Sequence, residues 1–155
     1  MIGKKAQLPL KQIVPDMPLA SLIKTPTQQR INLYAGMSND YNPIHVDADY
    51  ARKSQFGGTI AHGMLVLSYI SEMMLSTFGP EWLSTGWLSI RFKSPALSGE
   101  KVKVDGKVRL VERTVNKTTV TCDVACRDKT NNPIITGEAG LIIDLASGPA
   151  IEVSK

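Results

Sequence analysis

The longest hydrophobic stretch of this chain predicts a buried helix. From about Ile60 to Thr77 the residues are apolar nearly all round, with no wide polar stripe at helical spacing. A helix without such a stripe is buried on most of its sides, so another part of the chain has to cover it. Gly79-Pro80 supplies the stop at its C-terminal end.

Four later segments have the pattern of strands and can provide that cover. They are Trp87–Lys93, Lys101–Glu112, Asn116–Arg127 and Ile134–Leu145. The alternation places Leu88, Ile90 and Phe92 on one face of the first, and Thr118, Val120, Cys122, Val124 and Cys126 on one face of the third. Short turns between successive strands predict an antiparallel meander. The predicted fold class is α+β, with one domain over residues 1–155 and a curved antiparallel sheet around one long helix.

The residues before the long helix predict shorter elements. An arm over residues 1–18 leads to a short strand that ends near Ile23. A helix start follows in Thr25-Pro26-Thr27-Gln28, with a threonine cap, a proline at the first helical position and a glutamine that completes a capping box. This helix is expected to stop at Gly36. Asp47 can cap a second helix over Ala48–Ser54, and a turn follows at residues 56–59.

The loop over residues 37–46 holds the main chemical candidates. Asp40 and His45 lie five positions apart, and Asn42-Pro43 between them disfavours helix and strand alike. A loop braced in this way can aim a carboxylate and an imidazole at one point, which suits general acid–base chemistry. The spacing alone also allows a plainer interpretation, in which Asp40 caps a turn and His45 is an ordinary loop histidine.

The only other histidine, His62, precedes Gly63 at the expected start of the long helix. The first N–H groups of a helix have no partners within it and carry the positive end of its dipole. Because glycine lets a ligand approach the backbone closely, Gly63 can donate a hydrogen bond to a developing oxyanion. The alternative is a glycine that only allows tight packing of the helix.

Metal and nucleotide chemistry are not expected. The residue types that can bind a metal are His45, Asp47, Asp49 and His62. They lack a recognised zinc spacing, and Asp47 is better used as a helix cap, so we predict no metal and no other cofactor. The chain also has no phosphate-binding glycine motif and no G-x-S-x-G elbow.

Composition narrows the classes of protein to which this chain can belong. A chain of 155 residues can bury roughly 68–70% of its unfolded surface, so it needs no disulfide or metal to fold. Cys122 and Cys126 would lie ~13 Å apart on one strand, too far for a disulfide, so reduced packing cysteines are expected. No apolar run reaches the ~18 residues of a membrane span and no signal peptide is recognised. We therefore expect a cytoplasmic protein that does not bind membranes.

The net charge of +4 and the pI of about 9.1 leave two interpretations open. Basic residues are scattered, with no run longer than Lys4-Lys5 or Arg52-Lys53. A nucleic-acid-binding surface needs basic residues clustered on one face, so nucleic acid is not the expected partner. The charge suits a small phosphorylated ligand, and it equally suits ordinary solubility.

Two stretches of the sequence resemble a known family. They are Tyr34-Ala35-Gly36-Met37-Ser38-Asn39-Asp40-Tyr41-Asn42-Pro43-Ile44-His45 and Phe56-Gly57-Gly58-Thr59-Ile60-Ala61-His62-Gly63-Met64-Leu65. With Ile90-Arg91-Phe92-Lys93-Ser94-Pro95 and Gly99-Glu100, the chain is similar over essentially its whole length to the MaoC-like, or (R)-specific enoyl-CoA hydratase, family. The resemblance implies a hot-dog fold, in which a sheet wraps a long central helix, and a dimer whose sheets join edge to edge.

The resemblance also implies roles for single residues. Asp40 and His45 would be the catalytic pair, with Gly63 as the backbone oxyanion donor. Ser71, eight residues after Gly63, would place a hydroxyl near the catalytic water. The other expected substrate-binding residues are Asn42, His62, Met64, Tyr34 and Phe56. The family usually has glycine where this chain has Asn39, and asparagine is the next most tolerant residue if that position has positive φ.

The implied reaction is the reversible hydration of a trans-2-enoyl thioester, carried on CoA or acyl-carrier protein, to the (R)-3-hydroxyacyl thioester. Two alternatives stay open. A hot-dog thioesterase generally has a carboxylate on the central helix, where Glu72 is the only acidic residue of this chain. A non-catalytic thioester-binding subunit of a hetero-oligomer would usually lack the Asp/His pair.

Overall fold

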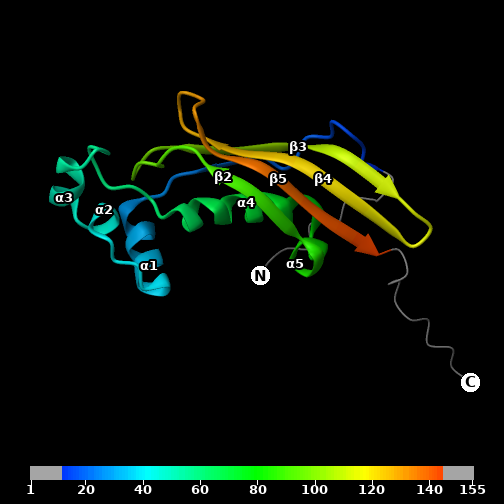
Figure 1. Ribbon diagram of the computed structural model, residues 1–155, viewed down its shortest axis with the longest axis horizontal. Coiled ribbons are helices and arrows are strands. Elements are labelled where there is room, and N and C mark those ends of the chain that lie inside the picture. The colour runs from blue at the N-terminus through cyan, green and yellow to red at the C-terminus, as the bar shows by residue number, and fades with distance from the viewer. Residues whose placement is uncertain (1–11, 145–155) are drawn as a thin grey trace, which may run out of the picture.

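The computed structural model describes residues 12–144, which form one antiparallel sheet with helix α4 along one of its faces (Figure 1). The strands are β1 (Leu22–Lys24), β2 (Trp87–Phe92), β3 (Val102–Arg113), β4 (Lys117–Arg127) and β5 (Pro133–Asp144). The helices are α1 (Gln28–Ser38), α2 (Pro43–Val46), α3 (Ala48–Lys53), α4 (Gly63–Phe78) and α5 (Glu81–Thr85). The strand order in the sheet is β1-β3-β4-β5-β2.

The core lies between α4 and the sheet, as the hydrophobic pattern predicted. The buried residues of α4 are Val66, Tyr69, Ile70, Met73, Met74, Thr77 and Phe78. On β4, the face predicted to point inward is buried at every alternate position from Thr118 to Cys126. The predicted α+β fold, a curved sheet around one long helix, is confirmed.

Cys122 and Cys126 are free thiols buried on that inner face, as predicted. Burial raises the pKa of each thiol to about 12, with a smaller contribution from Asp123 near Cys122 and from Asp105 near Cys126. Both side chains therefore act as protonated packing groups.

The position of β2 corrects the predicted meander. Strands β3, β4 and β5 follow one another, but β2 pairs with β5, with Trp87 opposite Gly140, and not with β3. The connection over residues 93–101 cannot return as a hairpin because it is bound to an earlier segment, where the Ala61 N–H donates to the Ala96 carbonyl. As a result β2 is an edge strand of the sheet.

Helix α1 differs from the prediction at both ends. It is capped by Thr27, whose hydroxyl accepts from the Arg30 N–H, and not by Thr25. It continues through Gly36 to Ser38 because the residue that leaves the helix is Asn39, with a left-handed φ of 56°. Asn39 thus has the positive φ that was considered for this position, a conformation that asparagine tolerates better than most residues.

The Asn42-Pro43 pair was expected to prevent regular structure, and this was wrong. Proline suits the first position of a helix because its missing N–H would have no acceptor there. Pro43 accordingly starts α2, and the Asn42 side chain accepts from the Ile44 N–H as its cap. The predicted cap of α3 is confirmed, with the Asp47 carboxylate accepting two backbone N–H groups.

Helix α4 begins later than expected and ends at the expected glycine. Ile60 forms a strand-like bridge with Leu97, so the helix starts only at Gly63. At the other end Gly79 has φ 74°, a left-handed value that favours glycine. No helix within residues 12–144 is long and apolar enough to cross a membrane.

Part of the predicted N-terminal arm, residues 1–11, lies outside the described residues. The rest of the arm runs along β3, where the Asp16 N–H donates to the Val108 carbonyl at 2.8 Å. The short strand expected near Ile23 is β1, which also pairs with β3. The arm thus covers the edge of the sheet opposite β2.

Candidate active site

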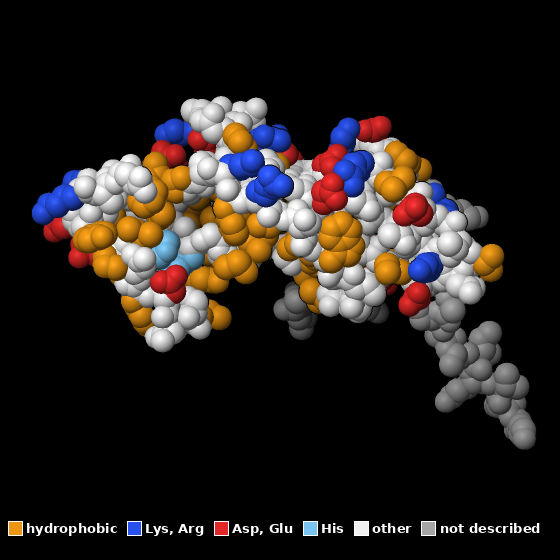
Figure 2. All heavy atoms as spheres, viewed as in Figure 1, with side chains coloured by type: hydrophobic (Ala, Val, Ile, Leu, Met, Phe, Trp, Pro, Cys, Tyr) orange, Lys and Arg blue, Asp and Glu red, His pale blue; other side chains and the backbone are white. Residues whose placement is uncertain are grey.

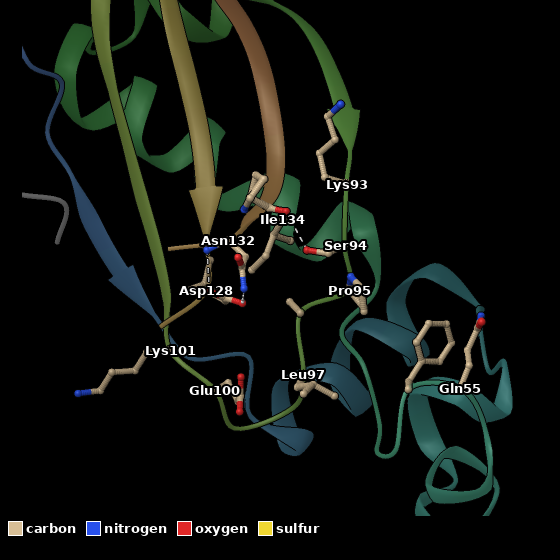
Figure 3. A pocket seen from close by; sticks show the side chains of 14 residues that line it. Gln55, Lys93, Ser94, Pro95, Leu97, Glu100, Lys101, Asp128, Asn132 and Ile134 are labelled. Carbon is tan, nitrogen blue, oxygen red and sulfur yellow. Dashed lines mark hydrogen bonds between the residues drawn. The ribbon is translucent and has the colours of Figure 1, made fainter. Parts of the chain in front are cut away.

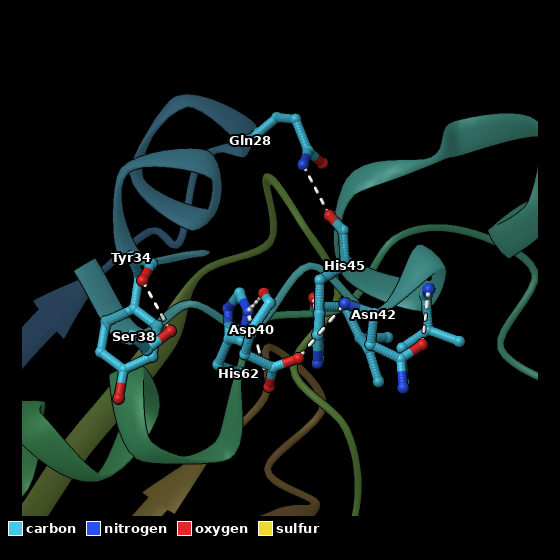
Figure 4. A network of polar contacts seen from close by, with 9 residues as sticks. Gln28, Tyr34, Ser38, Asp40, Asn42, His45 and His62 are labelled. Carbon is cyan, nitrogen blue, oxygen red and sulfur yellow. Dashed lines mark hydrogen bonds and ion pairs between the residues drawn. The ribbon is translucent and has the colours of Figure 1, made fainter. Parts of the chain in front are cut away.

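Three elements meet at the N-terminal end of α4 and bring Asp40, His45 and His62 together (Figure 4). Asp40 follows α1, His45 belongs to α2 and His62 precedes α4. One ligand-type atom from each side chain lies within 4.8 Å of the other two. Figure 2 shows the two histidines at the floor of a hollow framed by hydrophobic side chains. The predicted acid–base pair therefore lies at one accessible point of the surface.

Asp40 is the exposed member of this group. Its N–H donates to the Ala35 carbonyl at the end of α1, and its Oδ1 accepts from the Asn42 N–H at 3.2 Å. The side chain is 53% exposed. The carboxylate is thus open to water and to a ligand that enters the hollow.

His45 is the buried member of the pair, with 8% of the residue exposed. Its Nδ1 lies 2.8 Å from the Ile60 carbonyl. Because a carbonyl can only accept, Nδ1 of the neutral ring carries the proton and Nε2 keeps its lone pair. The main chain of His45 is also held, since Gln28 Nε2 donates to its carbonyl at 2.7 Å. The ring is fixed with Nε2 as its free acceptor.

His62 fills the space behind the pair and is only 3% exposed. Its ring stacks on that of His45, with centroids 3.8 Å apart and an interplanar angle of 27°. The centroid of the Tyr34 ring lies 4.9 Å from the centroid of the His62 ring. His62 Nε2–H donates to the main-chain carbonyl of Asp40 at 3.0 Å. His62 and Tyr34, both predicted to bind substrate, therefore contact each other, and His62 also contacts both members of the acid–base pair.

Gly63 is the first residue of α4, so its N–H has no acceptor within the helix. A Cβ atom at this position would lie 3.0 Å from Cε1 of Phe92. The absence of a side chain lets the Phe92 ring of β2 pack against the start of the helix. Together with the positive end of the helix dipole, this N–H can stabilise negative charge next to the Asp40 and His45 side chains.

The other predicted substrate-binding residues lie in different environments. Met64 is 57% exposed beside Gly63. The Asn42 side-chain oxygen is used as the cap of α2. Ser71 lies about 12 Å from Gly63 along the helix axis, and its hydroxyl accepts from Trp82 Nε1 at 2.8 Å. Within one chain, the structure does not bring Ser71 to the acid–base pair.

A pocket of about 630 Å³ lies beside the site, between the end of α3 and the end of the sheet (Figure 3). Phe56, the last of the predicted contacts, lines it with Lys93 and Lys101 from the β2–β3 connection. The two lysines were missed because a lysine near a surface turn is common and gives no signal of its own. Gln28 was predicted to complete the capping box of α1. Its side-chain amide donates instead to the His45 carbonyl.

The ligand-type atoms of Asp40, His45 and His62 lie within 4.8 Å of one another, so they could hold a metal ion, but two contacts compete with this role. His62 Nε2 is already bonded to the Asp40 carbonyl. Metal ligands direct their lone pairs at one centre, whereas stacked rings hold theirs side by side. Asp47, a candidate ligand from the sequence, is the cap of α3. The expectation that no metal is used stays a prediction.

Comparisons with known proteins agree on one family. The profile of the MaoC like domain family matches residues 11–129. The (R)-specific enoyl-CoA hydratase of Rhodospirillum rubrum is 35% identical over 127 residues, which are 80% of this chain and 84% of that protein. The mitochondrial 3-hydroxyacyl-[acyl-carrier-protein] dehydratase of Arabidopsis thaliana is 32% identical over 119 residues, covering 76% of this chain and 70% of the relative.

Solved structures give the same picture of the fold. The unliganded R-hydratase PhaJ1 of Pseudomonas aeruginosa superposes with a TM-score of 0.75 at 26% identity, over 96% of this chain and 97% of that one. The (R)-hydratase from A. caviae superposes with a TM-score of 0.72 over 84% of this chain and 96% of that one. The hot-dog fold expected from the sequence is therefore shown by independent structures.

Proposed function

Because the chain belongs to the MaoC-like domain family, we propose that it is a hydro-lyase that reversibly hydrates trans-2-enoyl thioesters to (R)-3-hydroxyacyl thioesters. The relatives named as a hydratase of enoyl-CoA and a dehydratase of 3-hydroxyacyl-carrier protein support both directions of this reaction. The observation that carries the proposal is the grouping of Asp40 and His45 with His62, which directly precedes Gly63, the first residue of α4.

The acid–base pair suits the addition of water across the C2=C3 bond. The Asp40 carboxylate and the His45 ring are close enough for one water to bridge them. One group removes a proton from this water as its oxygen bonds to C3, and the double-bond electrons move to the thioester as an enolate. A proton from the pair is then delivered to C2, so that one water is added in total. Both new bonds form on the face that the pair occupies.

The start of α4 suits the thioester oxygen, where negative charge develops during this reaction. The Gly63 N–H can donate to that oxygen, and the helix dipole adds positive potential at the same point. Such a donor is most effective when it is already in place, because no reorganisation is then needed as charge appears. No cofactor takes part in these steps.

The environment of Glu72 favours hydration over the thioesterase alternative. Glu72 lies about 14 Å from Gly63 along the axis of α4. Its carboxylate forms an ion pair with Lys24 and is thus directed toward β1. A carboxylate in this position cannot activate a nucleophile beside the Gly63 N–H of the same chain.

The pocket beside the site suits the polar arm of a CoA or carrier-protein thioester. Phe92 lies against Gly63, and the next residue, Lys93, lines the pocket together with Lys101. Glu100 and Asp128 also line this pocket, and we propose that the two ammonium groups, not these carboxylates, meet an arm that leaves the thioester past Phe92. Charge-assisted hydrogen bonds from lysine are a common means of binding phosphate.

We expect the protein to form a homodimer or a dimer-based oligomer. Among the described residues, no strand pairs with the outer edge of β2, and unpaired edges are liabilities that proteins cover. Hydrophobic side chains are exposed nearby, with Trp87 40% and Met64 57% exposed. A second copy joined at β2 would cover both the edge and these side chains. A cytoplasmic location stays a prediction.

The test of the proposed function is an assay of the purified protein with trans-2-enoyl-CoA substrates from C4 chains to aromatic ones. Loss of the enone absorbance without release of free thiol, with an (R)-configured product, would support it. Thiol release without hydration would favour a thioesterase instead. Binding of the thioester with neither reaction would indicate a non-catalytic subunit.

A further inference from the structure

We propose that His62 is a positioning residue, which holds Asp40 and His45 in a fixed place relative to the Gly63 N–H. The sequence suggested a substrate contact for His62, but its surroundings are those of a support. The kinetic test of this proposal rests on the proposed function. A second test rests on the geometry alone.

His62 is the group that both members of the pair contact. Its Nε2–H donates to the Asp40 carbonyl at 3.0 Å, and its ring lies 3.8 Å from the His45 ring, centroid to centroid. The Asp40 N–H also donates to the Ala35 carbonyl at 3.2 Å. The half-exposed carboxylate accepts from the Asn42 N–H at 3.2 Å, and its Oδ2 lies 4.0 Å from His62 Nε2. The carbonyl bond to His62 therefore limits how far the Asp40 loop can move.

The backbone of His62 is itself well anchored. It is the cap of α4, and the Val66 N–H donates to its carbonyl at 3.2 Å. The preceding residue, Ala61, is bonded through its N–H to Ala96 at the end of the sheet. The next residue is Gly63. The same rigid segment thus provides two groups. They are the Gly63 N–H, which is the proposed oxyanion donor, and the His62 side chain, which supports Asp40 and His45.

The burial of both ring nitrogens argues against direct participation of His62 in proton transfer. Nε2 is occupied by the Asp40 carbonyl. Nδ1 is buried and has no hydrogen-bond partner among residues 12–144. A proton on Nδ1 would create a buried N–H without an acceptor, which is unfavourable. His62 then acts through Asp40 and His45 and not on the substrate.

The kinetic test uses three substitutions that remove different parts of this support. His62→Ala removes the hydrogen bond and the stacked ring, and should lower kcat by about 10- to 100-fold, the usual cost of a small misplacement of catalytic groups. KM should change little. His62→Gln can restore the donor to the Asp40 carbonyl, and His62→Phe can restore the stacked ring, so each should recover part of the lost kcat. An unchanged kcat in His62→Ala, or a loss expressed only in KM, would overturn the proposal.

A double substitution separates positioning from a general loss of stability. If His62 acts through the pair, His62→Ala should cost much less in a His45→Gln background than in the wild type. Equal losses in both backgrounds would overturn the proposal. Thr77→Val is the matched control, because Thr77 is a buried residue of α4 that accepts the Ala20 N–H far from the site. It should lower the Tm with little change in kcat.

The second test needs no substrate, so it stands even if the protein hydrates no enoyl thioester. The His45 Nδ1–H, bonded to the Ile60 carbonyl, should give a slowly exchanging imidazole signal in the NMR spectrum of the wild type. Exchange should become fast in His62→Ala and remain slow in His62→Phe. An identical His45 signal in all three proteins would show that His62 does not hold the ring, and the proposal would fail.

Discussion

The indole Nε1 of Trp82 donates a hydrogen bond to the Ser71 hydroxyl at 2.8 Å and so joins α5 to α4. Trp82 is only 6% exposed, and a buried indole N–H needs an acceptor. Ser71→Ala should therefore lower the free energy of unfolding by about 1 kcal/mol, measured by urea denaturation, and leave kcat nearly unchanged. A large loss of kcat in Ser71→Ala that is absent in Trp82→Phe would instead place this hydroxyl beside the reacting water.

Substitution of the acid–base pair should abolish most of the activity without unfolding the protein. Asp40→Asn and His45→Gln should each lower kcat by about 10²-fold or more, because general acid–base catalysis typically contributes 10²–10⁴-fold. Hydration is measured by the enone absorbance, with circular dichroism and mass measurement as controls for fold and assembly. Near wild-type turnover in either folded variant would remove that residue from the mechanism.

Two substitutions at Gly63 separate a lost hydrogen bond from steric crowding. Gly63→Pro removes the N–H at a helix position that tolerates proline, and should cost roughly 10²–10³ in kcat. Gly63→Ala keeps the N–H but places a Cβ 3.0 Å from Phe92 Cε1. Because Phe92 is 53% exposed, its ring can shift, and we expect mainly a higher KM. If both variants lose the same kcat, crowding explains the result and the donor role is wrong.

The two lysines of the pocket should matter only for substrates with a phosphorylated arm. Lys93→Glu and Lys101→Glu should raise KM for an enoyl-CoA and leave KM for the matching N-acetylcysteamine thioester unchanged, because the short thioester has no phosphate. Lys117→Glu, at the far end of the sheet, is the control. Equal effects on both thioesters would mean that the arm does not use this pocket.

Alkaline pH should destabilise the fold through the two buried thiols. Burial raises the pKa of Cys122 and Cys126 from the ordinary value of 9.0 to about 12. As the pH rises above about 9, the unfolded chain loses these protons while the folded chain keeps them, so the free energy of unfolding falls up to about pH 12. The Tm should decline less steeply from pH 8.5 to 10.5 in a Cys122→Ala, Cys126→Ala double variant. Parallel curves would contradict this assignment.

Prediction from the sequence succeeded where a feature depends on neighbouring residues. The long buried helix and the inner face of β4 follow from hydrophobic spacing. The cap at Asp47 and the stop at Gly79 follow from local backbone preferences. The proximity of Asp40 and His45 was expected from their spacing and is seen in the fold, whereas the roles of Asp40, His45 and Gly63 came from the family resemblance and stay predictions.

Features that depend on segments far apart in the chain were missed or misassigned. The pairing of β2 with β5 required the β2–β3 connection to bind residues 59–61, which no local pattern announces. Gln28 was assigned to a helix cap because an amide fits that role, but in the fold the His45 carbonyl lies within its reach. A side chain's type does not tell which partner the fold brings to it.

The sequence by itself determined the elements, their buried faces and the residues that can perform acid–base chemistry, because periodicity and backbone preference act over a few residues. Only the tertiary structure decided that β2 lies at the edge beside Gly63, that Ser71 bonds to Trp82, and that His62 lies behind the acid–base pair. These arrangements depend on how the helix start, the sheet end and the α1–α2 segment pack together. That packing depends on the burial of the whole core. It decides which hydrogen-bond partners lie close enough to each of these side chains.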